Sequence, residues 1–275
     1  MTAILTWNIQ YGKGCDGRID LARIAKVARA MGEADVLCFQ EVARNDPAIA
    51  EGADQAEELA ALFPDHEGVF GAGLNRLSAG GRRREFGNLV FSRLPVLQVF
   101  RHLLPQPAEP GIKHMQRQAI EVVVDTLGGP LRIVTTHLEY HSASHRAAQI
   151  ARLRELQAEV AENEALPPKA APSPYDPVPR PSSAVICGDL NLLPDDAQYQ
   201  LLFQDTFVNA WRHLRRGEPD PATTGLHDRT QWPMGGHCRD YFAVTHDVAR
   251  RIRAVDIDTT TDASDHQPLK LVLAD

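Results

Sequence analysis

The stretch that most constrains the fold of this chain is residues 182–191, S-S-A-V-I-C-G-D-L-N. Its apolar residues 184–187 predict a short buried strand, which breaks at Gly188. Asp189 and Asn191 then stand on the loop just beyond the strand. In α/β folds such positions often carry function, because the sheet fixes the side chain and the loop gives access. D-L-N alone is also an ordinary turn sequence, so the interpretation depends on what the other strand ends carry.

Other strand-like segments end or begin in the same way, with an acid, an amide or an imidazole. Each such residue has an ordinary explanation in isolation, such as an exposed loop carboxylate, but together they predict one shared site. A hard divalent cation such as Mg²⁺ is typically bound by a few carboxylates and several waters. Histidines can transfer protons near neutral pH. The residues are Asn8, Glu41, His137, Asp189 with Asn191, Asp240, and Asp265 with His266.

The segments between these strands have helical or turn-like patterns. We expect Asp20 to cap a helix over residues 21–31, and further helices over residues 54–62, 145–164, 197–203 and 208–214. Strands are expected at residues 96–102 and 118–126, and another begins at Asn88. Residues 71–87 are rich in Gly and Arg and are expected to form a loop, in which Arg82, Arg83 and Arg84 are either a solvated run or a phosphate contact. The Pro-rich residues 166–181 predict an extended surface connector.

Composition limits the class of protein. The 275 residues, 43% apolar and 24% charged, suit one large α/β domain over residues 1–275. The net charge of -7 argues against a globally basic nucleic-acid-binding surface but leaves local basic patches open. No protein partner is indicated.

The cysteines and the apolar runs bear on location. The four cysteines have no C-x-x-C spacing, and Cys38 and Cys187 lie in apolar runs, so we interpret them as reduced core residues. No run approaches the roughly 20 apolar residues of a membrane span. Strand-like sequence begins at Ala3, which leaves no room for a signal peptide. We therefore expect a cytoplasmic protein.

The motifs together resemble the endonuclease/exonuclease/phosphatase superfamily, whose members include DNase I, exonuclease III-like repair nucleases, bacterial sphingomyelinases, inositol polyphosphate 5-phosphatases and poly(A) deadenylases. The resemblance covers nearly the whole chain. It implies a four-layer α/β sandwich of two packed mixed β-sheets, as in DNase I, and hydrolysis of a phosphate ester with Mg²⁺ or Mn²⁺. The motifs, in order, are T-W-N-I-Q, F-Q-E-V, G-N-L-V-F-S-R, T-T-H-L, G-D-L-N, R-D-Y-F and S-D-H-Q-P-L.

The resemblance also implies roles for the metal ligands and the imidazole pair. Glu41 would be the principal metal ligand, with Asn8 adjacent and Asp265 as a further ligand. Asp240 would pair with His266, fix its tautomer and raise its basicity.

The remaining implied roles concern the water and the phosphate. Asp189 would orient or deprotonate the attacking water, and Asn191 would hold a phosphoryl oxygen. His137 would contact the phosphate or act as the acid for the leaving group. The candidate substrate-binding residues are Asn88, Arg117 and Arg146.

The substrate is less constrained than the reaction. A His at the position of His137 resembles the DNase I, sphingomyelinase, phosphatase and deadenylase branches, and makes an abasic-site repair enzyme a weaker match. The leading prediction is a phosphodiesterase that cleaves DNA or RNA. The alternatives are a phosphatase or a sphingomyelinase-like phospholipase, and a catalytically silent binding member. The complete acid and His set argues against the silent alternative.

Overall fold

The strands pair into two mixed β-sheets of six strands each, in a computed structural model that describes residues 1–78 and 80–275. In each sheet the two central strands are parallel, β1 with β2 and β7 with β8, and the other neighbours are antiparallel. The first sheet has the order β11 (Ile252–Ile257), β12 (Leu269–Leu273), β1 (Thr2–Asn8), β2 (Val36–Arg44), β4 (Arg83–Ser92) and β3 (Glu67–Leu77). The second has the order β5 (Val96–Leu103), β6 (Gln118–Thr126), β7 (Gly129–Thr136), β8 (Ala184–Asp189), β10 (Asp240–Thr245) and β9 (Phe207–Asn209).

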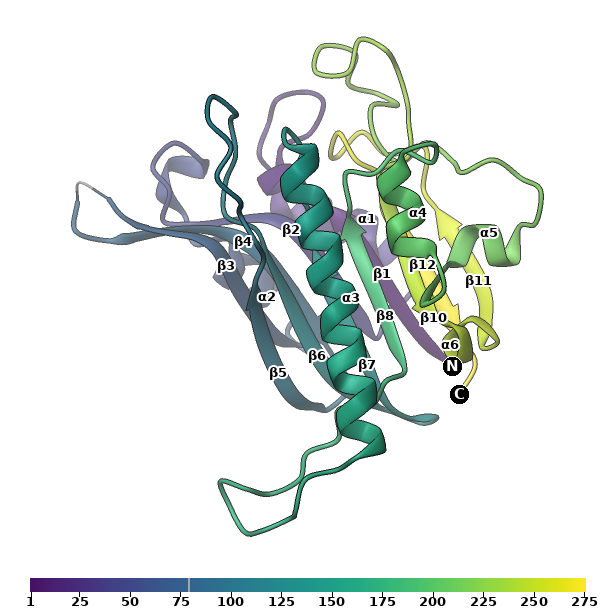
Figure 1. Cartoon of the computed structure of the whole chain (residues 1–275). Coiled ribbons are helices and arrows are strands. Elements are labelled where there is room, and N and C mark those ends of the chain that lie inside the picture. The colour runs from purple at the N-terminus through teal and green to yellow at the C-terminus, as the bar shows by residue number, and fades with distance from the viewer. Residues whose placement is uncertain (79) are drawn as a thin grey trace.

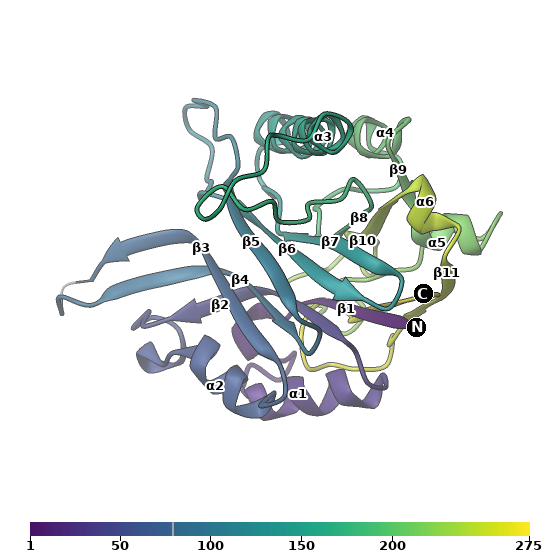
Figure 2. The same ribbon diagram turned by 90° about the horizontal axis from the view of Figure 1, so that it is seen from below.

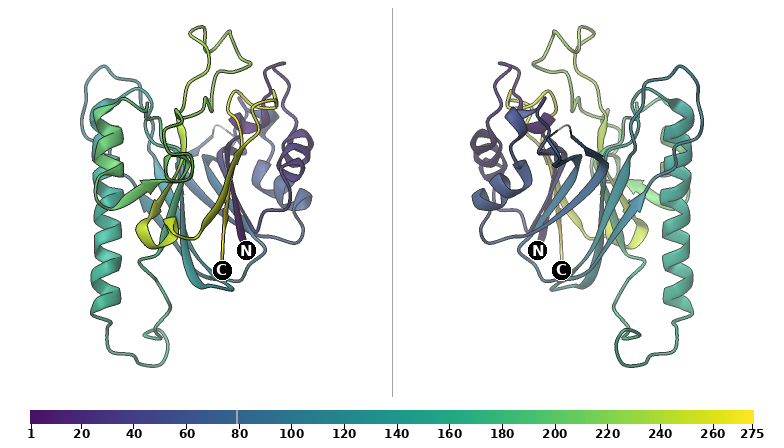
Figure 3. Two further views of the ribbon diagram at one scale, coloured as in Figure 1. Left: turned by 90° about the vertical axis from the view of Figure 1, so that its right-hand side faces the viewer. Right: turned by 90° about the vertical axis from the view of Figure 1, so that its left-hand side faces the viewer.

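Helices cover the outer faces of both sheets. Two of them lie against the first sheet and two against the second, which gives the predicted four layers (Figures 2 and 3). Asp20 caps α1 as expected, because its carboxylate accepts a hydrogen bond from the backbone N–H of Arg23. The helices are α1 (Leu21–Ala30), α2 (Gln55–Leu62), α3 (Ala143–Ala165), α4 (Ala197–Phe203), α5 (Ala210–Leu214) and α6 (His246–Ala249), with short 3-10 turns at Gln10–Gly12 and Ala50–Gly52.

The pleat of the strands explains the layering. Along β1, Ile4 joins the core between the two sheets, whereas Leu5 packs under the helices on the outer face. Along β8, Val185 and Cys187 face the inner core, and Ile186 faces the helix layer. These strands are therefore buried on both faces, which is why they read as continuous apolar runs.

Two expected elements differ from the structure. Residues 71–87 are not a loop, because β3 and β4 pair across this segment as far as Leu77 and Arg83; Ala79 lies outside the described residues. Residues 208–214 are not one helix, because Phe207–Asn209 pairs with β10. Asn209 then caps α5 by accepting a hydrogen bond from the N–H of Trp211, so the helix begins only at Ala210.

The segment from residue 166 to residue 183 forms neither helix nor strand, as the proline content predicts. All four cysteines are free thiols, and Cys15 alone among them is not buried. Within residues 1–78 and 80–275, no helix combines the length and apolarity needed to cross a bilayer. A single domain over residues 1–275 stays a prediction.

We expect the substitution Gly188→Ala to destabilise the protein by about 2–3 kcal/mol. Gly188 has φ +132°, and a Cβ there would lie 2.0 Å from the carbonyl oxygen of Thr136 on the parallel neighbour β7. Urea unfolding measures the change. Gly217→Ala is the matched control, since Gly217 has φ +86° but nothing within 4 Å of a Cβ. Equal effects of the two substitutions would show that only the backbone angle matters.

Candidate active site

Glu41 is turned toward the site by a β-bulge. Between the pairs Phe39↔Leu89 and Val42↔Gly87, the two residues Gln40 and Glu41 face only Asn88. Glu41 has φ 61°, a left-handed conformation that a non-glycine residue rarely adopts. Such strain at a strand end is typical of functional positions, and here it places the carboxylate at the mouth of a pocket.

Asp189 and Asn191 lie where β8 ends, as the sequence predicts. The Oδ1 atom of Asp189 accepts a hydrogen bond from the N–H of Asn191, which has φ 51°. The side-chain amide of Asn191 donates to the carbonyl oxygen of Leu138, beyond the end of the adjacent strand β7. The amide thus joins the ends of β7 and β8.

Asp240 and His266 form the predicted pair. The Nδ1 atom of His266 lies 2.8 Å from Oδ2 of Asp240, and Thr223 donates its hydroxyl hydrogen to the same oxygen at 2.7 Å. The indole N–H of Trp7 donates to the carbonyl oxygen of His266, which ties the last motif of the chain to the first. These contacts fix the imidazole so that Nε2 is left for the pocket.

The strands that carry these residues end on the side of the sandwich away from the chain termini (Figure 1), and their side chains line one cavity. Oδ2 of Asp189 lies 3.2 Å from Nε2 of His137 and 3.7 Å from Nε2 of His266. The same oxygen accepts a hydrogen bond from the side-chain amide of Asn8 at 3.1 Å. They border a cavity of about 350 Å³, here called the catalytic pocket, which is lined by Glu41, Lys113, Arg117, His137, Tyr140, His141, Asp189, Asn191, Gln231, Trp232, Asp265 and His266.

The two imidazoles have different charge states. Burial, together with the Arg117 guanidinium, lowers the pKa of His137 to about 3, so this ring is neutral at pH 7. Burial also opposes a charged His266, but the carboxylates of Asp240 and Asp189 outweigh burial and raise the pKa of His266. A neutral His137 suits a hydrogen bond to phosphate better than the role of leaving-group acid.

Asp189 is ionised between these imidazoles. Burial alone would raise the pKa of its carboxyl group, but the imidazolium of His266 and the guanidinium of Arg239 hold that pKa below its ordinary value. An ionised carboxylate in this setting has the chemistry to accept a proton or to orient a water molecule.

The donor set around Glu41 fits a divalent cation. Burial, with the negative charge of Asp265, raises the pKa of Glu41 to about 7. Within the described residues, no Lys or Arg nitrogen lies within 4.0 Å of either carboxylate, and the ring that lies 3.8 Å from Glu41, through Nδ1 of His137, is neutral. Oδ2 of Asp265 accepts hydrogen bonds from the neutral side chains of Gln231 and Trp232. Two uncompensated carboxylates are the ligands that Mg²⁺ and Mn²⁺ prefer.

Asn8 contacts Glu41 through its NH₂ group, at 3.0 Å. Its Oδ1 atom accepts a hydrogen bond from the backbone N–H of Gln10. Because an NH₂ group does not ligate a cation, the amide of Asn8 as placed here orients the Glu41 carboxylate; Asn8 as a metal ligand stays a prediction.

A second position for a cation lies among Asp189, Asp240 and His266, whose ligand atoms are all within 4.8 Å of one another. The direct hydrogen bond between Asp240 and His266 already satisfies two of these groups. The unpaired carboxylates of Glu41 and Asp265 are therefore the better ligands.

The three candidate substrate-binding residues lie at different distances from the pocket. Arg117 lines it, with its Nε–H donating to Glu139 at 3.2 Å. Asn88 is inside β4 rather than at its start, and lines a narrow extension of the pocket beside Glu41. Arg146 does not line the catalytic pocket, because its guanidinium donates to Gln198 and to the backbone of residues 139 and 140.

Arg239 was not among the candidates predicted from the sequence. Its guanidinium donates to Oδ1 of Asn191 at 3.2 Å and lies over the rings of Tyr140 and Trp232. Trp232 in turn donates its indole N–H to Asp265 at 2.9 Å. The only sequence signal was the position of Arg239 directly before Asp240.

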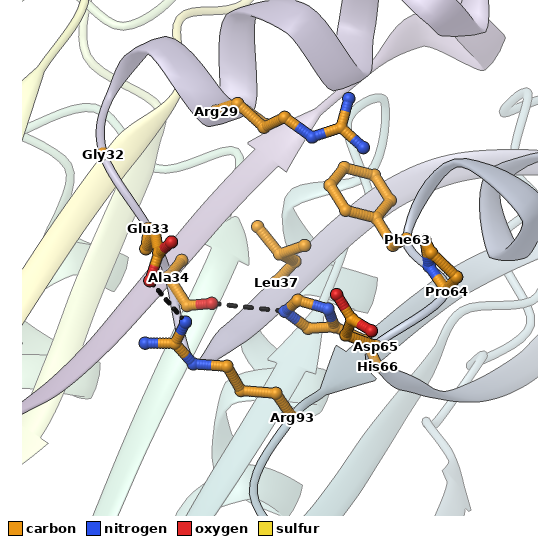
Figure 4. A pocket seen from close by; sticks show the side chains of 11 residues that line it. Arg29, Gly32, Glu33, Ala34, Leu37, Phe63, Pro64, Asp65, His66 and Arg93 are labelled. Carbon is orange, nitrogen blue, oxygen red and sulfur yellow. Dashed lines mark hydrogen bonds and ion pairs between the residues drawn. The ribbon is translucent and has the colours of Figure 1, made fainter.

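A further cavity, of about 390 Å³, lies between α1, the end of α2 and the start of β2 (Figure 4). Within its lining, Arg93 donates to Glu33 at 2.8 Å, and Nε2 of His66 lies 3.2 Å from the carbonyl oxygen of Ala34. Among the described residues, its lining has no cluster of several acids and imidazoles like that of the catalytic pocket, so we do not assign the hydrolytic reaction to this cavity.

Comparisons with known proteins agree with this geometry. A protein from Beutenbergia cavernae, described as endonuclease/exonuclease/phosphatase, is 25% identical with a TM-score of 0.72, over 98% of this chain and 70% of the other. A mannosyl-6-phosphatase of Bacteroides thetaiotaomicron superposes with a TM-score of 0.69 at 13% identity, over 100% of both chains. The Neisseria 3′ phosphatase NExo, bound to a product DNA hairpin, superposes with a TM-score of 0.65 at 17% identity, also over 100% of both.

A search of the curated proteins gave no match. The family model described as Endonuclease/Exonuclease/phosphatase family matches residues 5–266, a range that contains every candidate site residue described above. The chain belongs to the endonuclease/exonuclease/phosphatase family.

Proposed function

We propose that this protein is a divalent-cation-dependent phosphodiesterase that cleaves DNA or RNA by attack of an activated water. The observation that carries the proposal is the convergence of Glu41, His137, Asp189 and His266 on one pocket. Membership of a phosphoesterase family supports the reaction class. A catalytically silent role fits less well, because each acid and imidazole of the set is present.

The proposed roles follow from the charge states. Glu41 and Asp265 would hold Mg²⁺ or Mn²⁺, which when bound offsets negative charge on the phosphoryl oxygens. Asp189 accepts the proton of the attacking water, and Asn191 lies beside it in the pocket. The imidazolium of His266, oriented by Asp240, stabilises charge that develops on the phosphoryl group. His137, as a neutral ring, hydrogen-bonds a phosphate oxygen.

Two observations support a nucleic-acid substrate. Lys113 and Arg117 place positive charge on one wall of the pocket, as a phosphate backbone requires. A fold relative, NExo, is described as bound to a product DNA hairpin.

A cytoplasmic location is also part of the proposal, because free cysteines suit a reducing compartment.

A phosphomonoesterase is the second candidate. The observation that favours it is the chemistry of two fold relatives, one described as a mannosyl-6-phosphatase and one as a 3′ phosphatase. A panel of single-stranded DNA, duplex DNA, RNA, sphingomyelin, inositol phosphates and sugar phosphates separates the candidates. Higher kcat/KM on a sugar phosphate than on any oligonucleotide would overturn the nuclease proposal.

We expect the chain to hydrolyse bis(p-nitrophenyl) phosphate with Mg²⁺ or Mn²⁺, and EDTA to abolish the activity until the cation is restored. Glu41→Gln should lower kcat on the order of 10²–10³-fold, because the neutral amide removes several kcal/mol of cation-dependent stabilisation. Calorimetric titration with Mn²⁺ should show weaker binding in the same variant. Glu58→Gln, an exposed carboxylate of α2, is the control. Unchanged Mn²⁺ affinity in Glu41→Gln would contradict the proposed ligand.

A further inference from the structure

We propose that the β3–β4 hairpin is an arm that binds phosphates and holds a nucleic-acid strand beyond the bond being cleaved. The inference rests on the proposed function and adds the surface that would recognise a polymer. The hairpin formed by Glu67–Leu77 and Arg83–Ser92 projects away from the body of the molecule (Figure 2). Its tip carries arginines that the catalytic pocket does not use.

The base of the hairpin continues the catalytic pocket. Phe86 and Asn88 on β4, with Gly73 on β3, line a narrow extension whose other walls include Glu41 and His137. A Cβ on Gly73 would lie 2.6 Å from the carbonyl oxygen of Gln116, so the hairpin base packs closely against the loop that carries Lys113 and Arg117. The hairpin base thus adjoins the side of the catalytic pocket that Glu41 and His137 form, and a strand that leaves the pocket over this side meets the hairpin.

Strand alternation places several arginines on the face that adjoins the pocket. Val90 belongs to the core between the two sheets, so residues 88, 86 and 84 of β4 point to the same side. Arg76 is directly opposite Arg84 in the register and shares its face. The ladder continues past the last strand pair, because the N–H of Ser78 donates to the carbonyl oxygen of Arg82. The resulting arginine stripe consists of Arg76, Arg82 and Arg84.

The stripe is available to an anion. Arg76 and Arg82 are exposed, and across the described part of the chain neither has a carboxylate within 4.0 Å. Arg84 lies 3.8 Å from Asp46. The acid of the hairpin tip, Glu85, points to the opposite face, where it accepts a hydrogen bond from Arg44 at 3.1 Å. Two unpaired guanidiniums and one weakly paired guanidinium thus lie along one face of the hairpin.

The length of the arm predicts a length of substrate. Four residues separate Phe86 from Arg82, which is about 14 Å of strand at about 3.4 Å per residue. A stacked strand carries one phosphate about every 3.4 Å. The affinity for an oligonucleotide should therefore rise until the strand extends about four nucleotides beyond the cleaved bond, and then level off.

The test measures binding of a labelled 20-nucleotide single strand by fluorescence anisotropy. A His266→Ala background keeps the strand intact while Mg²⁺ is present. We expect the double variant Arg76→Ala/Arg82→Ala to raise Kd about tenfold and to reduce the slope of log Kd against log salt by about 1.4, or about 0.7 per lost phosphate contact. The affinity for a dinucleotide should be unchanged.

The matched control is Arg83→Ala, an exposed arginine of the same tip that pairs with Leu77 on the opposite face. It should change Kd less than about twofold. Equal weakening by Arg83→Ala would overturn the proposal, and so would competition by poly-L-glutamate as strong as that by an oligonucleotide of equal charge.

Turnover of bis(p-nitrophenyl) phosphate separates failure of this inference from failure of the function. All hairpin variants, made without the His266 substitution, should retain wild-type turnover of this small substrate. If the wild type hydrolyses bis(p-nitrophenyl) phosphate but does not bind the 20-nucleotide strand, the hairpin proposal is wrong and the proposed phosphoesterase activity is still supported. If the wild type does not hydrolyse it with either cation, the function itself fails.

Discussion

Replacing His266 by Ala is expected to lower kcat on bis(p-nitrophenyl) phosphate by about 10³–10⁴-fold. The imidazole lies between Asp240, at 2.8 Å, and Asp189, at 3.7 Å. Its removal eliminates the positive charge that the proposed mechanism places beside the phosphoryl group, and both carboxylates lose the imidazolium between them. KM should change less than kcat, because the lost interaction strengthens as charge develops in the transition state.

Asp240→Asn tests whether the pair acts as a unit. The amide can still hydrogen-bond Nδ1, but it neither fixes the tautomer nor stabilises the imidazolium. We expect its loss of kcat to approach that of His266→Ala, and the double variant to be little worse than either single one, because residues that act together are not additive. Multiplicative losses would instead indicate independent roles.

The control for these variants is His246→Ala. His246 is exposed on α6, the helix that lies next to the chain termini in Figure 1, and it does not line the catalytic pocket. This substitution should leave kcat unchanged. A kcat for His266→Ala within tenfold of the wild type would remove His266 from the mechanism.

The strand ends could be predicted from the sequence because burial on both faces makes an apolar run conspicuous. The runs before Glu41 and Asp189 are continuous in the sequence and lie in central strands in the structure. The motif resemblance then supplied the four-layer arrangement, which periodicity alone does not determine. What the sequence could not supply is orientation. The NH₂ end of Asn8 faces Glu41 because the N–H of Gln10 takes its oxygen.

The hairpin at residues 71–87 shows a different limit of prediction from the sequence. Gly and Arg are poor strand formers in isolation, yet the segment pairs residue by residue because β4 continues a strand anchored in the core. A Cβ on Gly87 would lie 1.9 Å from the carbonyl oxygen of Gly71. The glycine that suggests a loop in the sequence is therefore needed because the two strands approach closely there. Arg239 escaped prediction for a related reason: its partners Asn191 and Tyr140 are distant in the chain.

The second large effect expected is on stability. Glu121→Gln should lower the free energy of unfolding at pH 7 by about 3–5 kcal/mol, because it leaves buried guanidiniums without their anion. Glu121 on β6 is fully buried and accepts hydrogen bonds from Arg132 at 3.1 Å and from Arg180 at 2.6 Å and 2.9 Å, while Nε2 of His102 lies 3.0 Å away. Arg180, which also lies over the ring of Phe100 at 4.1 Å, attaches the Pro-rich segment to the second sheet. The variant should therefore also be cut faster within residues 166–181 by a protease.

The pH dependence distinguishes this network from simple packing loss. Burial would raise the pKa of Glu121, but Arg180, His102 and Arg132 outweigh burial and hold that pKa well below its ordinary value. A depressed pKa contributes stability that is complete above the unfolded value, about 4.3, and is lost as the pH falls toward the folded value. Urea unfolding at pH 7, 5, 4 and 3 should therefore show that the difference in the free energy of unfolding between the wild type and Glu121→Gln shrinks below about pH 4.3.

The control is Glu159→Gln, which removes an exposed partner of Arg152. It should lower the free energy of unfolding by less than about 1 kcal/mol. If the difference in the free energy of unfolding between the wild type and Glu121→Gln stays constant down to pH 3, the ionised carboxylate of Glu121 is not what stabilises the network.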